Sequence, residues 1–556
     1  MAGSHVQIKK EDRTMKKLLA LLCALMLVAT AVPFAFAEEE PITITYYREE
    51  LNRNAVATYA ETAWVQELEK RLNIKLEIQG PGSSDDYNTA VNAMLTTKNY
   101  PDLLFYDWTQ YPGGALAGVE DGVIVPVSEI PEYKDKVPNW FKVLDEHPEV
   151  RRGVVEDDGS VVVFCHWEPN MARSAYWGYA IRKDWLDRLG LEIPKTIDDL
   201  YAVMTAFKEQ DANGNGDPTD EIPFSCCNWW GTAHPGMDSL AAAFSLKVNT
   251  IYRDPQNDKM TYWTEYNNGE NFKAYVSTLT KWYQEGLIDT DAITQKYDAW
   301  AAKVTGDKVG VFFCFPDNVA SWEESIRQTL KDQAYGNPDD VAIYGLVPLT
   351  GIDGVPYNYD NDNALVGYVG SGQPTVITSA AVKNGHIDKC LELLNYLYSD
   401  EGSELINWGV KDVSYTIDAD GNHVWTDKVT NDPDYPMSDA VFKYALPTYG
   451  GWPKAMSYEA WGSMNLTVED QIITHKNYAA GDAGLDKPGF SLNMEEQEAT
   501  NPLTEINTAV SEVYLNVIVG NKSIDELDNL INQVKGMGIG DVVNAYQSAY
   551  ERFLSR

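Results

Sequence analysis

The order of strand-like and helix-like segments after residue 40 constrains the fold most. Residues 42–46 alternate between apolar and polar side chains, residues 64–72 carry apolar side chains at helical spacing, and residues 74–78 alternate again. Another helical stretch precedes a third strand pattern at residues 102–106. Strands that alternate with helices predict an α/β fold whose sheet is largely parallel and covered by helices.

Ligands of such sheets lie beyond the carboxyl ends of the strands. In this sequence those ends carry Tyr47 with Arg48, and Asp107 with Trp108. We therefore expect a ligand near these four residues.

The chain has 556 residues, too many for one simple core, so we expect two lobes. Strand and helix patterns recur at residues 179–208, and further apolar strands occur at 309–315 and 374–378. Such late strands indicate that the chain crosses between the lobes more than once. We assign residues 1–37 to a leader and signal peptide, 38–170 plus about 309–378 to the N-terminal lobe, and about 171–308 plus 379–556 to the C-terminal lobe.

A cleavable export signal is predicted at residues 15–37. Lys16 and Lys17 precede an apolar run at residues 18–32, and the small-x-small triplet at residues 35–37 precedes three glutamates. The run is too short for a membrane anchor, which needs about 20 apolar residues. Cys23 follows a leucine instead of a small residue, so we do not expect lipid attachment there. Residues 1–14 are either an over-long start or a cloning remnant.

The net charge of −39 argues against nucleic acid and anionic lipid as partners. Five cysteines follow the signal without paired spacing, which speaks against a disulfide framework and a zinc site. The adjacent Cys226 and Cys227 are either free thiols, the reading we favour, or a strained vicinal disulfide.

A calcium-like loop is predicted at residues 211–221. Oxygen-bearing side chains stand at alternate positions one, three and five, and glycine occupies position six, as a short loop around a hard cation requires. Ile222 and Pro223 depart from a helix-loop-helix sensor, and an ordinary polar turn is the alternative. We expect structural calcium on Asp211, Asn213, Asn215, the carbonyl of Asp217, Asp220 and Glu221.

Many aromatic residues lie in polar or glycine-rich surroundings. A flat apolar ring beside polar hydrogen-bonding groups suits a sugar, which has an apolar face and a rim of hydroxyls. Core packing is the alternative for any single ring. The ligand contacts that we expect are Trp108, Trp167, Tyr176, Trp177, Trp229, Trp230 and Trp452.

The sequence contains no GxSxG, HExxH, phosphate-binding GxxxxGK[ST] or GxGxxG motif after a strand. Carboxylates are so abundant that an acid and base pair for glycoside hydrolysis cannot be identified by position. We therefore expect a binding protein and no catalytic residues. An extracellular glycoside-active enzyme is the alternative.

The chain resembles the large extracellular solute-binding proteins of bacterial ABC importers for complex sugars, a group that includes alginate-binding and other oligosaccharide-binding receptors. The resemblance is most specific at residues 179–191, which lead into 211–223, and at 380–384 followed by 391–409. In that family a cation loop of this composition holds calcium in the second lobe. Here the loop is one residue longer before Asp220 and Glu221.

The resemblance implies a two-lobed periplasmic-binding-protein-like fold, the Venus-flytrap arrangement, in which the ligand favours the closed form. It implies a monomeric receptor at the outer face of the cytoplasmic membrane that captures an oligosaccharide and docks on the permease subunits of an ABC importer. A peptide or lipopeptide receptor on the same scaffold is a further alternative.

Overall fold

The structure is a computed structural model, and it describes residues 40–81, 84–167, 177–227, 235–265, 268–358, 374–448, 451–482 and 484–556. By its internal contacts the chain divides into two compact units, Met1–Ile42 and Thr43–Arg556. The predicted signal peptide and Cys23 lie outside the described residues. Among the helices of the described ranges, none has both the length and the apolar character to cross a membrane.

The first sheet has the strand order β10-β3-β1-β2. Its strands are β1 (Ile42–Tyr47), β2 (Ile74–Ile78), β3 (Leu103–Phe105) and β10 (Thr375–Ile377). β1 runs parallel to β3, with Tyr46 opposite Leu103, whereas β10 runs antiparallel to β3. The sheet is therefore mixed, because β10, a strand from far along the chain, joins its edge antiparallel to the parallel strands that the sequence predicts.

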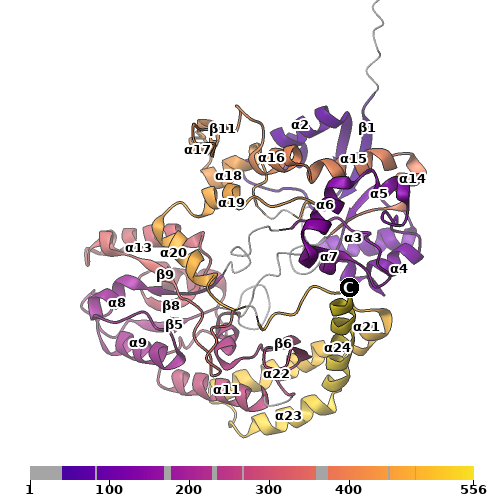
Figure 1. The fold of residues 1–556 in the computed structure, drawn as a ribbon. Coiled ribbons are helices and arrows are strands. Elements are labelled where there is room, and N and C mark those ends of the chain that lie inside the picture. The colour runs from indigo at the N-terminus through magenta and orange to yellow at the C-terminus, as the bar shows by residue number, and fades with distance from the viewer. Residues whose placement is uncertain are drawn as a thin grey trace, which may run out of the picture. The chain divides into compact units, whose positions relative to one another are not determined.

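Helices surround the first sheet and share one hydrophobic core with it. α2 (Ala63–Leu72) buries Trp64, Val65, Leu68 and Leu72, in agreement with the stripe predicted from the spacing of Trp64, Leu68 and Leu72. It lies beside α15 (Ile387–Leu397) (Figure 1). The helical elements and the hairpin of this lobe are η1 (Tyr59–Glu61), α2 (Ala63–Leu72), α3 (Ser84–Thr97), η2 (Trp108–Gln110), α4 (Gly114–Glu120), α5 (Pro131–Lys134), α6 (Pro138–Glu146), α7 (Pro148–Val154), α14 (Ser379–Asn384), α15 (Ile387–Leu397), α16 (Asp400–Trp408), β11 (Tyr415–Ile417), β12 (His423–Trp425), α17 (Asp427–Thr430), α18 (Met437–Ala440), η6 (Val441–Lys443) and α19 (Tyr458–Asn465).

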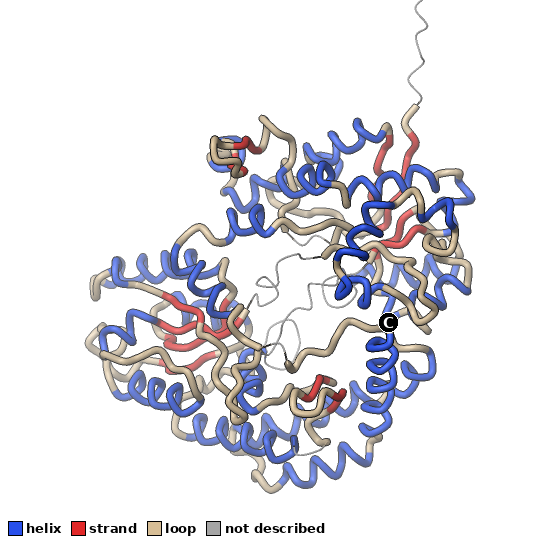
Figure 2. Tube along the Cα trace, in the orientation of Figure 1, coloured by secondary structure: helices blue, strands red, loops and turns tan. Residues whose placement is uncertain are grey.

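The second sheet has the order β5-β8-β4-β9 and is also mixed. Its strands are β4 (Gly178–Arg182), β5 (Ile222–Ser225), β8 (Val309–Cys314) and β9 (Ile343–Gly345). β8 pairs in parallel with β5, and β4 pairs antiparallel with both β8 and β9. Helices cover both faces, with α8 (Lys183–Leu189) and α9 (Ile197–Glu209) on one and α12 (Tyr297–Thr305) and α13 (Asn318–Gln333) on the other (Figures 1 and 2).

The sheets correct the expected lobe division in two places. The strand at residues 309–314 was expected in the first lobe, but it lies inside the second sheet between β5 and β4. The helix at residues 387–397 was expected in the second lobe, but Leu391 and Leu394 belong to the first core together with Ile44 and Leu103. An apolar pattern predicts burial without saying against which partner, so it could not make either assignment.

A further helical group completes the second lobe. In it α11 (Asn268–Gln284) and α22 (Leu503–Ile518) share the hydrophobic core that lies under β5 and β8. The remaining elements are α10 (Pro235–Asp238), η4 (Ser239–Phe244), β6 (Tyr252–Asp254), β7 (Lys259–Thr261), α11 (Asn268–Gln284), η5 (Pro338–Asp340), α20 (Glu469–Tyr478), α21 (Met494–Ala499), α22 (Leu503–Ile518), α23 (Glu526–Gly536) and α24 (Ile539–Ser555).

Local sequence signals set the ends of α8 and α9 as expected. Gly190 ends α8 with a φ of 68°, a left-handed conformation that glycine adopts without a steric penalty. Thr196 begins α9, and its hydroxyl accepts a hydrogen bond of 3.1 Å from the backbone N–H of Asp199. The Asp199 carboxylate accepts in return from the Thr196 N–H at 3.1 Å, which completes a capping box.

Candidate functional site

The ends of the four strands of the second sheet meet at one edge. Cys314 at the end of β8 lies opposite Gly178 at the start of β4, and Gly345 at the end of β9 lies opposite Ala180. β5 runs parallel to β8 and ends at the same edge. The chain therefore brings together, at the carboxyl ends of three strands, segments that are far apart in the sequence. This is where ligands of α/β sheets bind.

A pocket opens at this edge. Four of its described lining residues are aromatic, Trp177, Tyr179, Tyr357 and Tyr478, and Ser239 and Asn358 add polar groups. The remaining lining residues are small or aliphatic and come from residues 240–243 and 346–349, apart from Gly178. A concave, mainly apolar surface with a few polar groups is the usual form of a small-molecule site.

Trp177 stands immediately before β4 at the margin of this pocket and is half-buried. Its ring meets Phe313 edge to face, with centroids 4.8 Å apart and an interplanar angle of 72°, and lies 6.5 Å from Phe315. These contacts hold the indole at the end of the sheet, where it lines the pocket. Of the predicted ligand contacts within the described residues, Trp177 lines this pocket.

Tyr478, the last residue of α20, closes one wall of the pocket and was missed by sequence reasoning. A Cβ atom at Gly178 or at Gly345 would lie 2.7 Å from its ring, so the ring fits only because both strands carry glycine there. Burial raises the pKa of the phenol well above its ordinary value. Glycines at the ends of two strands were the available signal, since they mark a close approach of another group.

The corresponding edge of the first sheet contains Arg48, as expected from its position after β1. The side chain is buried, with 3% of its surface exposed. Its guanidinium lies 4.6 Å from the ring centroid of Trp452, 4.9 Å from that of Tyr59 and 5.0 Å from that of Phe105. It also donates a hydrogen bond of 3.1 Å to the Tyr59 hydroxyl. These rings stabilise the buried cation through their negative faces.

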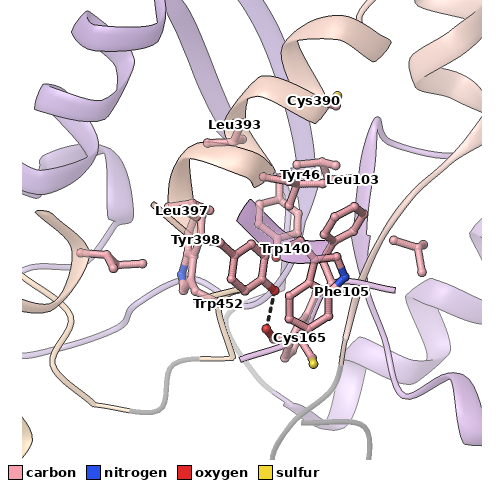
Figure 3. Close-up of a cluster of buried hydrophobic side chains, with 14 of the residues drawn as sticks. Tyr46, Leu103, Phe105, Trp140, Cys165, Cys390, Leu393, Leu397, Tyr398 and Trp452 are labelled. Atoms are coloured by element: carbon pink, nitrogen blue, oxygen red, sulfur yellow. Dashed lines mark hydrogen bonds between the residues drawn. The ribbon is translucent and has the colours of Figure 1, made fainter. Parts of the chain in front are cut away.

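Three predicted aromatic contacts of the first lobe are core residues in this structure. Trp108 and Trp452 have no exposed surface, and Trp167 has 7%. The Trp452 ring centroid lies 5.0 Å from that of Trp64 and 5.2 Å from that of Tyr46. Figure 3 shows Trp452 and Tyr46 in this buried cluster. In this conformation a ligand has no access to Trp108 or Trp452, so both side chains are part of the core here. The predicted contacts Tyr176, Trp229 and Trp230 lie outside the described residues.

The calcium-like loop follows α9 and folds on itself through its own side chains. The Asp211 carboxylate accepts from the Gly216 N–H at 2.9 Å, and Glu221 accepts from the Ala212 N–H at 2.8 Å. The side-chain amides of Asn213 and Asn215 lie 3.2 Å and 3.1 Å from Asp220 Oδ1. The Asp217 N–H donates to Asn215 Oδ1 at 2.7 Å, and its carboxylate accepts from the Thr219 N–H at 3.1 Å. All six predicted ligand residues therefore lie in one hydrogen-bonded loop.

Two carboxylate oxygens of the loop, Asp211 Oδ1 and Glu221 Oε2, are buried and have no hydrogen-bond partner in the described part of the chain. Burial, with the charge of Asp220 in addition, raises the pKa of Glu221. Oxygen donors with unused lone pairs fit a hard cation. Among the described residues, no three His, Cys, Asp or Glu side chains are already gathered in metal-binding geometry. The asparagine oxygens and the backbone would supply the rest of a calcium sphere.

Two mixed sheets, each with its own core, and an aromatic pocket at strand ends define a two-lobed α/β ligand-binding protein. Residues 54–404 match the family described as bacterial extracellular solute-binding protein. The chain belongs to the bacterial extracellular solute-binding protein family.

Individual relatives agree with this assignment. The chain is 32% identical over 263 residues to a Streptococcus pneumoniae protein named fructooligosaccharide ABC transporter substrate-binding protein FusA, and the alignment covers 46% of each chain. The chain thus spans about half the length of the curated relatives it matches. A solved solute-binding protein from Bifidobacterium longum infantis, described as HMO binding and ABC-transporter associated, superimposes with a TM-score of 0.68 at 21% identity, over 92% of this chain and 99% of that one.

A solved FusA structure, described as an EF-hand mutant in complex with fructo-nystose, superimposes with a TM-score of 0.64 at 20% identity, over 93% of this chain and 99% of that one. At such identities the structural likeness establishes the fold, which is the two-lobed α/β fold expected from the sequence.

Proposed function

We propose that this protein is an extracytoplasmic receptor that captures an oligosaccharide for an ABC importer. The observation that carries the proposal is the pocket at the edge of the second sheet, where Trp177 lies beside three tyrosines, Ser239 and Asn358. Family membership and the names of the relatives support it.

The pocket suits a sugar ring for a physical reason. A pyranose or furanose has an apolar face of C–H groups, which packs on an indole, and hydroxyls at its rim, which need hydrogen-bond partners. Trp177 offers the flat surface, and Ser239 and Asn358 offer polar atoms beside it. A ligand that touches both lobes only in the closed form would favour closure.

A thermal-shift screen with oligosaccharides tests the proposal. A ligand at a hundredfold excess over its Kd stabilises the folded state by about 2.7 kcal/mol, which raises the melting temperature measurably. Trp177→Ala is expected to weaken binding of the stabilising sugar by about tenfold or more, the usual result for a central aromatic contact. Tyr201→Ala, which truncates a half-buried ring on α9 outside the pocket, is the matched control. The absence of stabilisation by any oligosaccharide would contradict the proposal.

We also propose that the loop at residues 211–221 binds calcium for stability. The unpaired oxygens of Asp211 and Glu221 support this, and a FusA relative is described as an EF-hand mutant. A chelator is expected to lower the melting temperature of the protein, and added calcium to restore it. Asp211→Ala should abolish that response. Asp418→Ala, in another Asp-rich turn, should preserve it. If the chelator leaves the melting temperature unchanged, the loop is an ordinary turn.

Export, cleavage after Ala37 and docking of a monomer on permease subunits complete the proposed role, which includes no chemistry by the chain itself. Mass spectrometry of the protein secreted by an expressing bacterium is expected to find Glu38 as the first residue. Oligosaccharides recovered after incubation with the protein are expected to elute unchanged in chromatography. New fragments would favour the glycoside-active alternative.

A further inference from the structure

We propose that the pocket beside Trp177 selects a neutral sugar residue over an acidic one, and that the hydroxyl of Tyr478 is one of its hydrogen-bonding groups. The inference rests on the proposed function, because it names the class of sugar that the same site takes. The charges and the polar atoms around this pocket are the basis of the inference. The sugars that we expect the pocket to exclude are uronic acids and other anionic sugars.

The described residues that line the pocket include no cation to meet an anionic ligand. None of its fourteen described lining residues is ionised at neutral pH. An anion that enters such a surface loses its hydration without gaining an ion pair, which is costly. A neutral ring loses only hydroxyl hydration, which single hydrogen bonds replace.

The charges that act on the Tyr357 phenol in this pocket are negative. The Tyr357 hydroxyl donates to Asp353 at 2.9 Å, and burial together with Asp353, Asp482 and Asp254 raises the pKa of this phenol. Three carboxylates thus act on one wall of the pocket, and the whole chain has a net charge of −39. Both the local and the long-range field repel an anionic sugar. The buried Arg48 belongs to the first sheet and is enclosed by aromatic rings, so it does not change the charge of this wall.

Tyr478 offers a polar atom that the described residues leave unused. Its side chain has 1% of its surface exposed, and its hydroxyl has no hydrogen-bond partner among the described residues. The ring is fixed across Gly178 and Gly345, so the hydroxyl cannot turn away to solvent. A buried phenol of this kind costs stability in the free protein, and a ligand hydroxyl that reaches it removes that cost. A site whose polar group is otherwise unpaired discriminates strongly against a ligand that lacks the matching hydroxyl.

The first experiment compares neutral and acidic sugars on the full mature chain by thermal shift and calorimetry. Neutral probes are kestose, nystose, and cello- and malto-oligosaccharides; acidic probes are oligogalacturonates and oligoalginates of similar length. We expect stabilisation by one or more neutral probes and none by the acidic ones. Equal or tighter binding of acidic probes overturns the charge selectivity and leaves the sugar receptor standing. No stabilisation by either class overturns the proposed function itself.

The second experiment tests the hydroxyl of Tyr478. Tyr478→Phe is expected to weaken binding of the stabilising neutral sugar by roughly fivefold to tenfold, the loss of about one hydrogen bond. Tyr252→Phe is a closely matched control. Tyr252 is also a buried phenol whose hydroxyl has no partner in the described ranges, but it lies in β6 outside the pocket. Unchanged affinity in Tyr478→Phe overturns the assignment of this residue.

A charge introduced at the margin tests the electrostatic argument independently. Val347 lines the pocket and is 39% exposed, so Val347→Lys adds a cation there without burying it. Binding of oligogalacturonate is expected to become detectable or at least several times tighter. Val382→Lys, 45% exposed on α14 of the first lobe, is the control for the change in net charge. Equal effects of the two lysines would show that the pocket itself does not set the selectivity.

Discussion

Arg182 at the end of β4 forms a buried ion pair with Asp307, the residue that precedes β8 by two positions. The two side chains are 1% and 0% exposed, and Arg182 also pairs with Asp184 at 2.6 Å. The backbone carbonyl of Asp307 accepts a hydrogen bond of 3.2 Å from Asn213 in the calcium-like loop. The second sheet and the loop are therefore joined at one residue.

Arg182→Met is expected to destabilise the protein by about 3–5 kcal/mol, because it leaves two buried carboxylates without their cation. Chemical denaturation measures the change. Lys183→Met removes the neighbouring cation, whose partner Asp187 is 65% exposed, and is expected to change stability by less than about 0.5 kcal/mol. A similar loss in both variants would show that the Arg182 ion pairs add little.

Glu323 on α13 is expected to make stability depend on pH. Burial, with the nearby Asp470 carboxyl, raises its pKa to about 7. A raised pKa means that the folded state prefers the protonated form, so this stabilisation is present at low pH and is lost as pH rises through about 7. Glu323→Gln should remain more stable than the parent protein above that pH, by on the order of 2 kcal/mol.

Melting temperatures of both proteins between pH 5 and pH 8.5 check this prediction. Glu324→Gln is the control, because that neighbouring carboxyl is 65% exposed. If the Glu323→Gln and parent curves run parallel, the Glu323 carboxyl does not titrate in this range.

Gly178→Ala is expected to destabilise the second lobe by about 1–3 kcal/mol, as overpacking of a filled site does. The added Cβ would meet the Tyr478 ring at 2.7 Å. Gly540→Ala, in the first turn of α24, meets nothing within 4 Å and is expected to stabilise the protein by about 0.4–1 kcal/mol. Thermal unfolding measures both. A stable Gly178→Ala variant would mean that Tyr478 can move without cost.

Thr196→Ala is expected to cost about 1 kcal/mol, since it removes the side-chain cap of α9. Thr205→Ala on the same helix is the control. The Thr205 hydroxyl donates to the Tyr201 carbonyl within the helix, and alanine is the better helix former, so we expect no loss. Denaturation midpoints of the two variants give the comparison, and a neutral Thr196→Ala would contradict the role of the capping box.

Several local features could be predicted because the physics that forms them is local. The stripe of Trp64, Leu68 and Leu72 needs only helical periodicity, and the cap at Thr196 needs only neighbouring groups. The turn at residues 211–221 follows from its own side chains. Whether a given tryptophan contacts the ligand or packs in the core was harder to predict. An indole in a polar stretch packs into a core as readily as it faces a ligand, and Trp108 and Trp452 do the former.

The sequence by itself determined the α/β class, the ends of several helices, the resemblance to importer receptors and the composition of the loop at 211–221. The tertiary structure decided that the strand at 309–314 joins the second sheet, and that Trp177, Tyr357 and Tyr478 line one pocket. The reason is physical. Periodicity along a chain records which side chains are buried, but burial against a particular partner depends on contacts between segments that are more than a hundred residues apart.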